Sequence, residues 1–181
     1  MNQEIIISSS DKEISAKITS LKKEGKIRKI ATRIYTSNLL EEPADIIKRN
    51  SLELLPALYP EAILSHRSAF EMKPTDNGHI FATYKYSKNI ILPGLTIHLL
   101  AGHEATNNDI RIGNLCRSSE ERAYLENMQQ SRESSQVSKC LSKEEIERKL
   151  QKKLVNYGED GLNEFRDRCR IISADLNMDN E

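Results

Sequence analysis

The sequence predicts an α+β fold, in which a mixed body of short strands and helices is followed by a helical tail. Strand-type and helix-type segments alternate irregularly up to about residue 115, and beyond that point every periodic segment is helical. Strands and helices that segregate along a chain in this way favour α+β over a parallel α/β sheet. We therefore expect three parts, at residues 1–40, 41–115 and 116–181.

The first part combines a strand, a helix and a hairpin. Residues 4–7 predict a short strand, and Ser10 with Glu13 predicts a capping box at the start of a helix. This helix carries an apolar stripe at helical spacing, made by Ile14, Ile18 and Leu21. Gly25 ends the helix, and two β-type runs between residues 27 and 36 predict a small hairpin.

The second part alternates short elements. In chain order we expect a helix over 43–56, a strand at 62–64, a short helix capped by Ser65, strands at 80–86 and 90–100, and a polar loop at 104–115. Pro43 falls near the first turn of its helix, where proline is tolerated. Pro93-Gly94 interrupts the second of the two longer strands.

The third part is helical. Ser118 with Glu121 and Ser142 with Glu145 predict two capping boxes, residues 131–139 predict a linker, and a last helix follows Gly158 and Gly161. Two small amphipathic helices are only marginally stable alone. They would gain from a further apolar surface, supplied by the N-terminal body, a second copy or a partner domain. We expect the tail to bind a partner through the apolar residues Ile146, Leu150, Leu154, Phe165 and Ile172.

Composition excludes several classes of protein. Aromatic residues make up only 5% and there is no Trp, which argues against extensive stacking of single-stranded bases. The apolar runs are far shorter than a membrane helix needs, so we expect no membrane association. The three cysteines, Cys116, Cys140 and Cys169, are too widely spaced for a disulfide framework or a zinc site, which favours a reducing cytoplasm.

Positive charge gathers at the N-terminus although the net charge is zero. Residues 1–40 hold eight Lys and Arg against four Asp and Glu, a net charge of +4. Seven cations are the expected DNA-binding residues: Lys17, Lys22, Lys23, Lys26, Arg28, Lys29 and Arg33. A helix followed at once by a basic two-stranded wing is how winged-helix proteins contact double-stranded DNA. The simpler interpretation is the solvated face of an ordinary α/β unit.

Two other groups of residues have the side chains of a catalytic pair or of a metal site, but not the spacing that either site needs. Ser65 beside His66 could form a nucleophile and a base, but neighbouring residues on a helix point about 100° apart, so we expect a capped helix start instead. The residue types of a metal site occur at His98, His103, Glu104 and Asp109, but without the spacing that such a site needs. Phosphate-binding glycine loops are also missing, so we expect no enzyme, no metal and no cofactor.

Several segments resemble the non-catalytic N-terminal region of bacterial Fic-family proteins, in order and spacing along nearly the whole chain. They include Leu21-Lys22-Lys23-Glu24-Gly25-Lys26-Ile27-Arg28-Lys29-Ile30, Ser65-His66-Arg67-Ser68-Ala69-Phe70 and Leu92-Pro93-Gly94-Leu95-Thr96-Ile97. The opening 35 or so residues are also similar to the winged-helix domain of AbiE-type antitoxins. These antitoxins repress their own promoters and oppose a nucleotidyltransferase toxin.

The chain departs from Fic enzymes at their active site. The motif HPFxDGNGR, through which they transfer AMP, is absent, and Arg122 stands where the family's inhibitory motif needs Ser or Thr. The resemblance therefore implies a non-catalytic, antitoxin-like regulator that binds DNA. The alternative is the target-recognising or inhibitory part of a split or truncated Fic adenylyltransferase, acting through contact with a Fic domain or a toxin protein.

Overall fold

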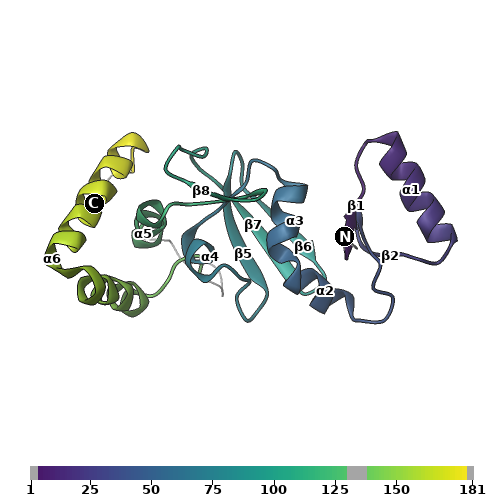
Figure 1. Ribbon diagram of the computed structural model, residues 1–181, viewed down its shortest axis with the longest axis horizontal. Helices are drawn as coiled ribbons and strands as arrows, with labels where there is room; N and C mark the ends of the chain where they lie inside the picture. Colours follow the sequence, from purple (N-terminus) through teal and green to yellow (C-terminus); the bar gives the residue numbers. More distant parts are fainter. Residues whose placement is uncertain (1–3, 130–137, 179–181) are drawn as a thin grey trace.

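The computed structural model describes residues 4–129 and 138–178, and it confirms the α+β class. The chain forms three parts in a row (Figure 1). A small sheet with helix α1 (Lys12–Lys23) lies at one end, a larger sheet with short helices occupies the centre, and helix α6 (Lys143–Asp175) lies at the other end. The two candidate interaction regions are therefore at opposite ends of the molecule.

The N-terminal unit has the predicted strand, helix and hairpin. Strands β1 (Ile5–Ile7), β2 (Arg28–Ala31) and β3 (Ile34–Thr36) form an antiparallel sheet in the order β1-β3-β2. The expected cap at Ser10 is wrong by one residue, because the Asp11 carboxylate accepts the backbone N–H groups of Glu13 and Ile14. Gly25 follows the helix with a φ of 68°, as expected of a residue that ends a helix in the left-handed region.

One apolar core joins this small sheet to the rest of the chain. Ile5, Ile30 and Ile34 belong to the same buried cluster as Ile46 and Ile47 of helix α2 (Pro43–Arg49). A polar clamp reinforces the joint, because the Glu4 carboxylate accepts hydrogen bonds from Arg49, Asn50 and Asn38. The boundary expected near residue 40 is therefore crossed by continuous packing.

The predicted helix over 43–56 is in fact two helices. Helix α2 ends at Arg49, and helix α3 (Ser51–Leu58) starts directly after Asn50. The Asn50 side-chain amide donates to the Ile46 carbonyl and to Glu4, and its backbone leaves the helical region, with φ −98° and ψ 12°. Asparagine commonly competes for backbone hydrogen bonds in this way, which explains the break.

The central sheet has six strands in the order β6-β7-β5-β4-β9-β8. They are β4 (Ile63–Leu64), β5 (His79–Tyr84), β6 (Lys88–Leu92), β7 (Leu95–Ala101), β8 (Ile110–Ile112) and β9 (Leu115–Arg117). The strand expected over 90–100 is a hairpin that turns at Pro93-Gly94. The loop expected over 104–115 contains β8 and the start of β9, so the boundary placed at residue 115 falls inside β9.

Two short helices connect the central sheet with the tail: α4 packs on β5, and α5 packs on α4 and on α6. Helix α4 (His66–Glu71) follows β4, and helix α5 (Glu120–Met128) follows β9. Ser119 caps α5 by accepting the N–H of Arg122, which corrects the capping box expected at Ser118. Most of the linker expected at 131–139 lies outside the described residues.

Helix α6 consists of two arms that meet at Gly158 (Figure 1). The Ser142–Glu145 capping box at its start is confirmed. Gly158 has φ 70° and ψ −175°, a conformation that is essentially restricted to glycine. The second arm packs on α5 through the edge-to-face contact of Phe165 with Tyr124.

Cys116 and Cys140 are buried, and Cys169 is partly exposed. Burial raises the pKa of Cys169 to about 11 and also raises the pKa of Cys116. Among residues 4–129 and 138–178, no helix combines the length and apolar character needed to span a bilayer.

Candidate functional site

Four of the seven predicted DNA-binding cations are exposed, and the described residues offer them no ion pair. They are Lys17, Lys22 and Lys23 on α1 and Lys29 on β2. Lysines that are not held in an ion pair keep their charge available for a phosphate backbone. They form the part of the predicted cluster that is available to a polyanion.

The other three predicted cations are engaged within the chain. Lys26 pairs with Glu24 at 2.7 Å, which raises the pKa of the lysine and lowers that of the glutamate. Arg28 donates to the carbonyls of Asn38 and Glu41 and so fixes the segment after the hairpin. The Arg33 Nε donates to the Ser8 carbonyl at 3.1 Å.

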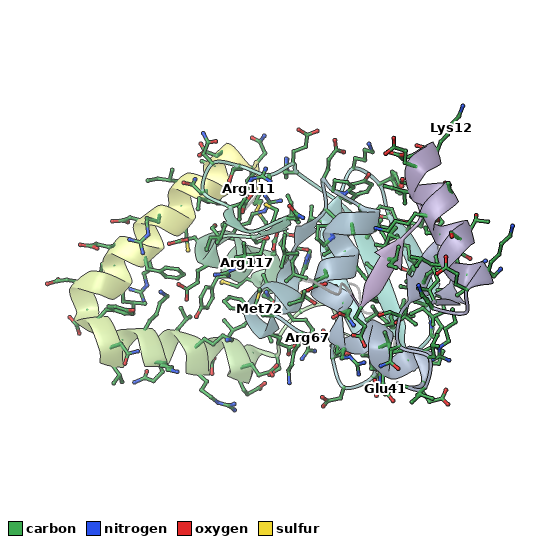
Figure 2. All side chains as sticks on the ribbon, turned by 45° about the vertical axis from the view of Figure 1, so that its right-hand side comes forward. Lys12, Glu41, Arg67, Met72, Arg111 and Arg117 are labelled. Atoms are coloured by element: carbon green, nitrogen blue, oxygen red, sulfur yellow. The ribbon has the colours of Figure 1, made fainter. Side chains whose placement is uncertain are left out.

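The lysines of α1 divide between two sides of the helix. At 100° per residue, Lys12 and Lys23 lie about 20° apart, whereas Lys17 lies about 120° from Lys23. Between Lys12 and Lys23, the outer side of the helix carries only small residues, Ala16 and Thr19. Lys12 projects away from the molecule at the end of α1 (Figure 2). It was missing from the predicted set because it precedes the densest run of charge.

The outer side of helix α1 is exposed to solvent, because only a small part of the helix packs against the rest of the chain. Ile18 is its only fully buried residue, and Ile14 is 38% exposed. The hairpin beside it turns through Arg33, which has a φ of 65°. The N-terminal unit thus presents a lysine-rich helix and a short wing at one end of the molecule.

The prediction that Ser65 and His66 are poorly placed to pair is wrong, and the Ser65 side chain makes no capping hydrogen bond to α4. The Ser65 Oγ lies 2.9 Å from the His66 Nδ1, and both residues are buried. His66 has a φ of 53°, so its side chain does not take the direction of a regular helical residue. Burial lowers the pKa of His66 to about 3, with the charges of Lys139 and Arg122 acting in the same direction. The imidazole is therefore neutral at pH 7.

Asp109 and Glu104, two candidate metal ligands, are instead linked to Arg122. The Arg122 Nη1 donates to Asp109 at 2.7 Å and to the Glu104 carbonyl at 3.1 Å, and its Nη2 donates to the His103 carbonyl. Its Nε donates to Glu126 at 3.0 Å. The side chains of Arg122, Asp109 and Glu126 are at most 4% exposed, so this network is a buried clamp between the 103–109 loop and α5.

Glu126 connects the clamp to His66. Its carboxylate accepts the backbone N–H of His66 at 3.0 Å and the Ser118 hydroxyl at 2.9 Å, in addition to Arg122. Burial raises the pKa of Glu126, while these hydrogen bonds and the Arg122 charge oppose the rise. The carboxylate is thus fully occupied within the chain.

His98 pairs with His79 rather than with the other candidate metal ligands. The His98 Nδ1 lies 3.0 Å from the Asn89 Oδ1, and its Nε2 lies 2.8 Å from the His79 Nδ1. Because an amide oxygen only accepts, the proton lies on Nδ1, and the Nε2 accepts from His79. Burial, together with His79, lowers the pKa of His98. Within the described residues no group of three or more His, Cys, Asp or Glu is placed to hold a metal.

The predicted partner-binding residues of the tail fall into two classes. Phe165 and Ile172, on the second arm, are 2% and 6% exposed and are covered by the chain itself. Ile146, Leu150 and Leu154, on the first arm, are only half-buried. Large apolar side chains also lie open on both arms, namely Val155, Tyr157 and Ile171.

Comparison of the chain with protein-family models, with curated proteins and with solved structures finds no match. The resemblance to Fic-family proteins and AbiE-type antitoxins therefore stays a prediction from the residues quoted for it.

Proposed function

We propose that this chain is a non-catalytic regulatory module that contacts double-stranded DNA through α1 and the β2–β3 wing. The observation that carries the proposal is the set of exposed lysines without ion pairs, Lys17, Lys22, Lys23 and Lys29, at one end of the molecule. Each phosphate contact releases condensed counterions, so binding of this kind weakens steeply with salt. An antitoxin-like repressor is the regulatory role that the sequence resemblance favours.

The shape of α1 supports the same function. A recognition helix contacts the major groove through an outer side that the rest of its own chain does not cover. On α1 this side carries Ala16 and Thr19 between Lys12 and Lys23. Lys29 on the adjacent wing is placed for phosphate contact, which fixes register and carries no sequence information.

The test is fluorescence anisotropy with duplex DNA at two salt concentrations. In the test variant, Ala replaces Lys17, Lys22, Lys23 and Lys29. We expect weaker binding and a salt slope that shrinks by about 0.9 for each phosphate that the variant no longer neutralises. A matched variant replaces four equally exposed cations elsewhere, Lys73, Lys88, Arg148 and Lys152. Equally weakened binding in the two variants would show that only overall charge matters.

A third variant separates DNA contact from structural support. Because Arg28 donates to backbone carbonyls at residues 38 and 41, Arg28→Ala removes a structural support of the hairpin. We expect it to lower thermal stability and to leave the salt slope of any remaining binding unchanged. A reduced slope in Arg28→Ala would return this arginine to the phosphate-binding set.

The second candidate function is protein–protein contact through the tail, with a Fic domain or a toxin protein as the partner. The half-buried stripe of Ile146, Leu150 and Leu154 favours it, since a further apolar surface would complete its burial. Hydrogen exchange tests it: the first arm of α6 is expected to exchange faster than the second arm in the isolated monomer and to slow when the partner binds. Full protection of both arms in a dilute monomer would remove the reason for a partner.

A further inference from the structure

A cavity of about 800 Å³ lies where the centre of the molecule meets the tail. Its walls come from the end of β7, the start of α4, helix α5 and the residues that directly follow α6. This volume lies in the range of small-molecule sites, which run from about 300 to 1,000 Å³. None of the lysines proposed to contact DNA lines it, so a ligand in this cavity is independent of the proposed function.

The buried His66 ring directs one nitrogen into this cavity. Its Nδ1 is bonded to Ser65, whereas its Nε2 has no hydrogen-bond partner among the described residues. Within the same residues, the only fully buried side-chain nitrogen or oxygen without a partner is the Arg117 Nε. The His66 Nε2 is therefore not fully buried, and because His66 lines the cavity, we infer that this nitrogen opens on it.

The backbone and the neighbours of His66 hold this orientation. Its φ of 53° is uncommon for a residue other than glycine, and its N–H is fixed by the buried carboxylate of Glu126. When the Ser65 hydroxyl donates to Nδ1, the proton of the neutral ring lies on Nε2. The ring then presents a hydrogen-bond donor to the cavity.

The other polar groups of the cavity make it suited to an anion. Arg122 and Glu126 on its wall are already paired with each other. Lys139 also lines the cavity, with no ion pair among the described residues. The amides of Gln129 and Asn177 add neutral donors, and the leucines Leu100, Leu125 and Leu176 form an apolar side.

We propose that this cavity binds a small organic anion, a carboxylate or phosphate ester with an apolar body. The Lys139 ammonium and the His66 Nε2–H hold the anionic group, and the leucine side chains hold the body. Arg122 is shared between Glu126 and Asp109 and keeps the wall rigid, so Lys139 is the one cation of the wall that remains for a ligand among the described residues. Binding is non-covalent, and both the ligand and the protein keep their covalent structure.

The test follows the His66 ring by NMR while benzoate, phenyl phosphate or neutral benzamide is added. We expect one or both anions to move the His66 ring resonances with saturation below about 10 mM, and benzamide to bind at least about tenfold more weakly. The benzoate and phenyl phosphate titrations distinguish a carboxylate site from a phosphate site. Equal binding of benzamide, or no shift with either anion, would overturn the proposal.

Variants assign the binding to this cavity. Lys139→Gln removes the partly exposed charge without opening the core, and we expect at least about a tenfold loss of anion affinity. His66→Asn is the second variant, since asparagine tolerates positive φ; its binding is followed by calorimetry. His98→Asn is the matched control, because His98 does not line the cavity. Unchanged affinity in Lys139→Gln, or an equal loss in the control, would refute the assignment.

Discussion

Replacing Arg122 by Met is expected to destabilise the chain more than any surface change. The Arg122 side chain is 3% exposed, and it pairs with both Asp109 and Glu126, whose side chains are 0% and 4% exposed. Methionine of similar length fills the space but leaves two buried carboxylates without their cation. Breaking a buried pair in this way costs about 3–5 kcal/mol, a large share of the roughly 5–15 kcal/mol that stabilises a typical domain.

Urea unfolding at pH 7, followed by circular dichroism, measures this destabilisation. With a slope of about 2 kcal/mol per molar urea, the midpoint falls by about 2 M. The destabilisation becomes smaller as the pH falls below 7, because burial already raises the pKa of Glu126 and removal of the cation raises it further. A proton on Glu126 then removes one of the uncompensated charges.

The matched control is Arg168→Met. Arg168 also pairs with a carboxylate of α5, at 2.8 Å from Glu121, but its side chain is 52% exposed. Exposed pairs contribute about 0–1 kcal/mol. If Arg122→Met costs less than about 1 kcal/mol, or no more than Arg168→Met, then the buried clamp does not hold the 103–109 loop in place.

Three further outcomes are expected. Hydrogen bonds from Arg49 and Asn50 hold the pKa of Glu4 at about 2, so its contribution is present above pH 4.5 and lost as the pH falls towards 2. Glu4→Gln is therefore expected to cost about 1 kcal/mol at pH 7 and little near pH 2 in urea unfolding, and equal costs would contradict this. Gly158→Ala is expected to cost about 1–3 kcal/mol in the same assay, and no cost would mean that the kink carries no strain. Because burial raises the pKa of Cys169 to about 11, its reaction with a disulfide reagent at pH 8 is expected to be slow until urea is added.

Local signals in the sequence predicted most of the first part and the tail. The capping box at Ser142 and the glycine that ends α1 are strong because each depends on a few neighbouring residues. The β8–β9 hairpin was missed although Gly113-Asn114 separates its two strands, and Gly-Asn is a two-residue hairpin signal. The strands have three residues each, too few for alternation to stand out.

The candidate sites depended on information that spacing along the chain does not contain. The lysine cluster is visible in the sequence, but which cations are free depends on backbone carbonyls at residues 38 and 41. The pairing of Ser65 with His66 depends on a single positive φ, which helical geometry does not predict. Arg122 meets Asp109 across 13 residues and a hairpin, so only the folded chain shows it as a clamp.

The two-residue strand β4 has a consequence for synthesis on the ribosome. Ile63 and Leu64 pair with β5 on one side and, in parallel, with β9 on the other, so they join the two halves of the central sheet. At roughly 5–20 residues per second, β9 is made several seconds after β4. During that interval one edge of β4 has no native partner. In the folded protein both residues are at most 1% exposed. In the nascent chain their apolar side chains and one strand edge are therefore exposed, and a chaperone can bind there until β9 has been synthesised.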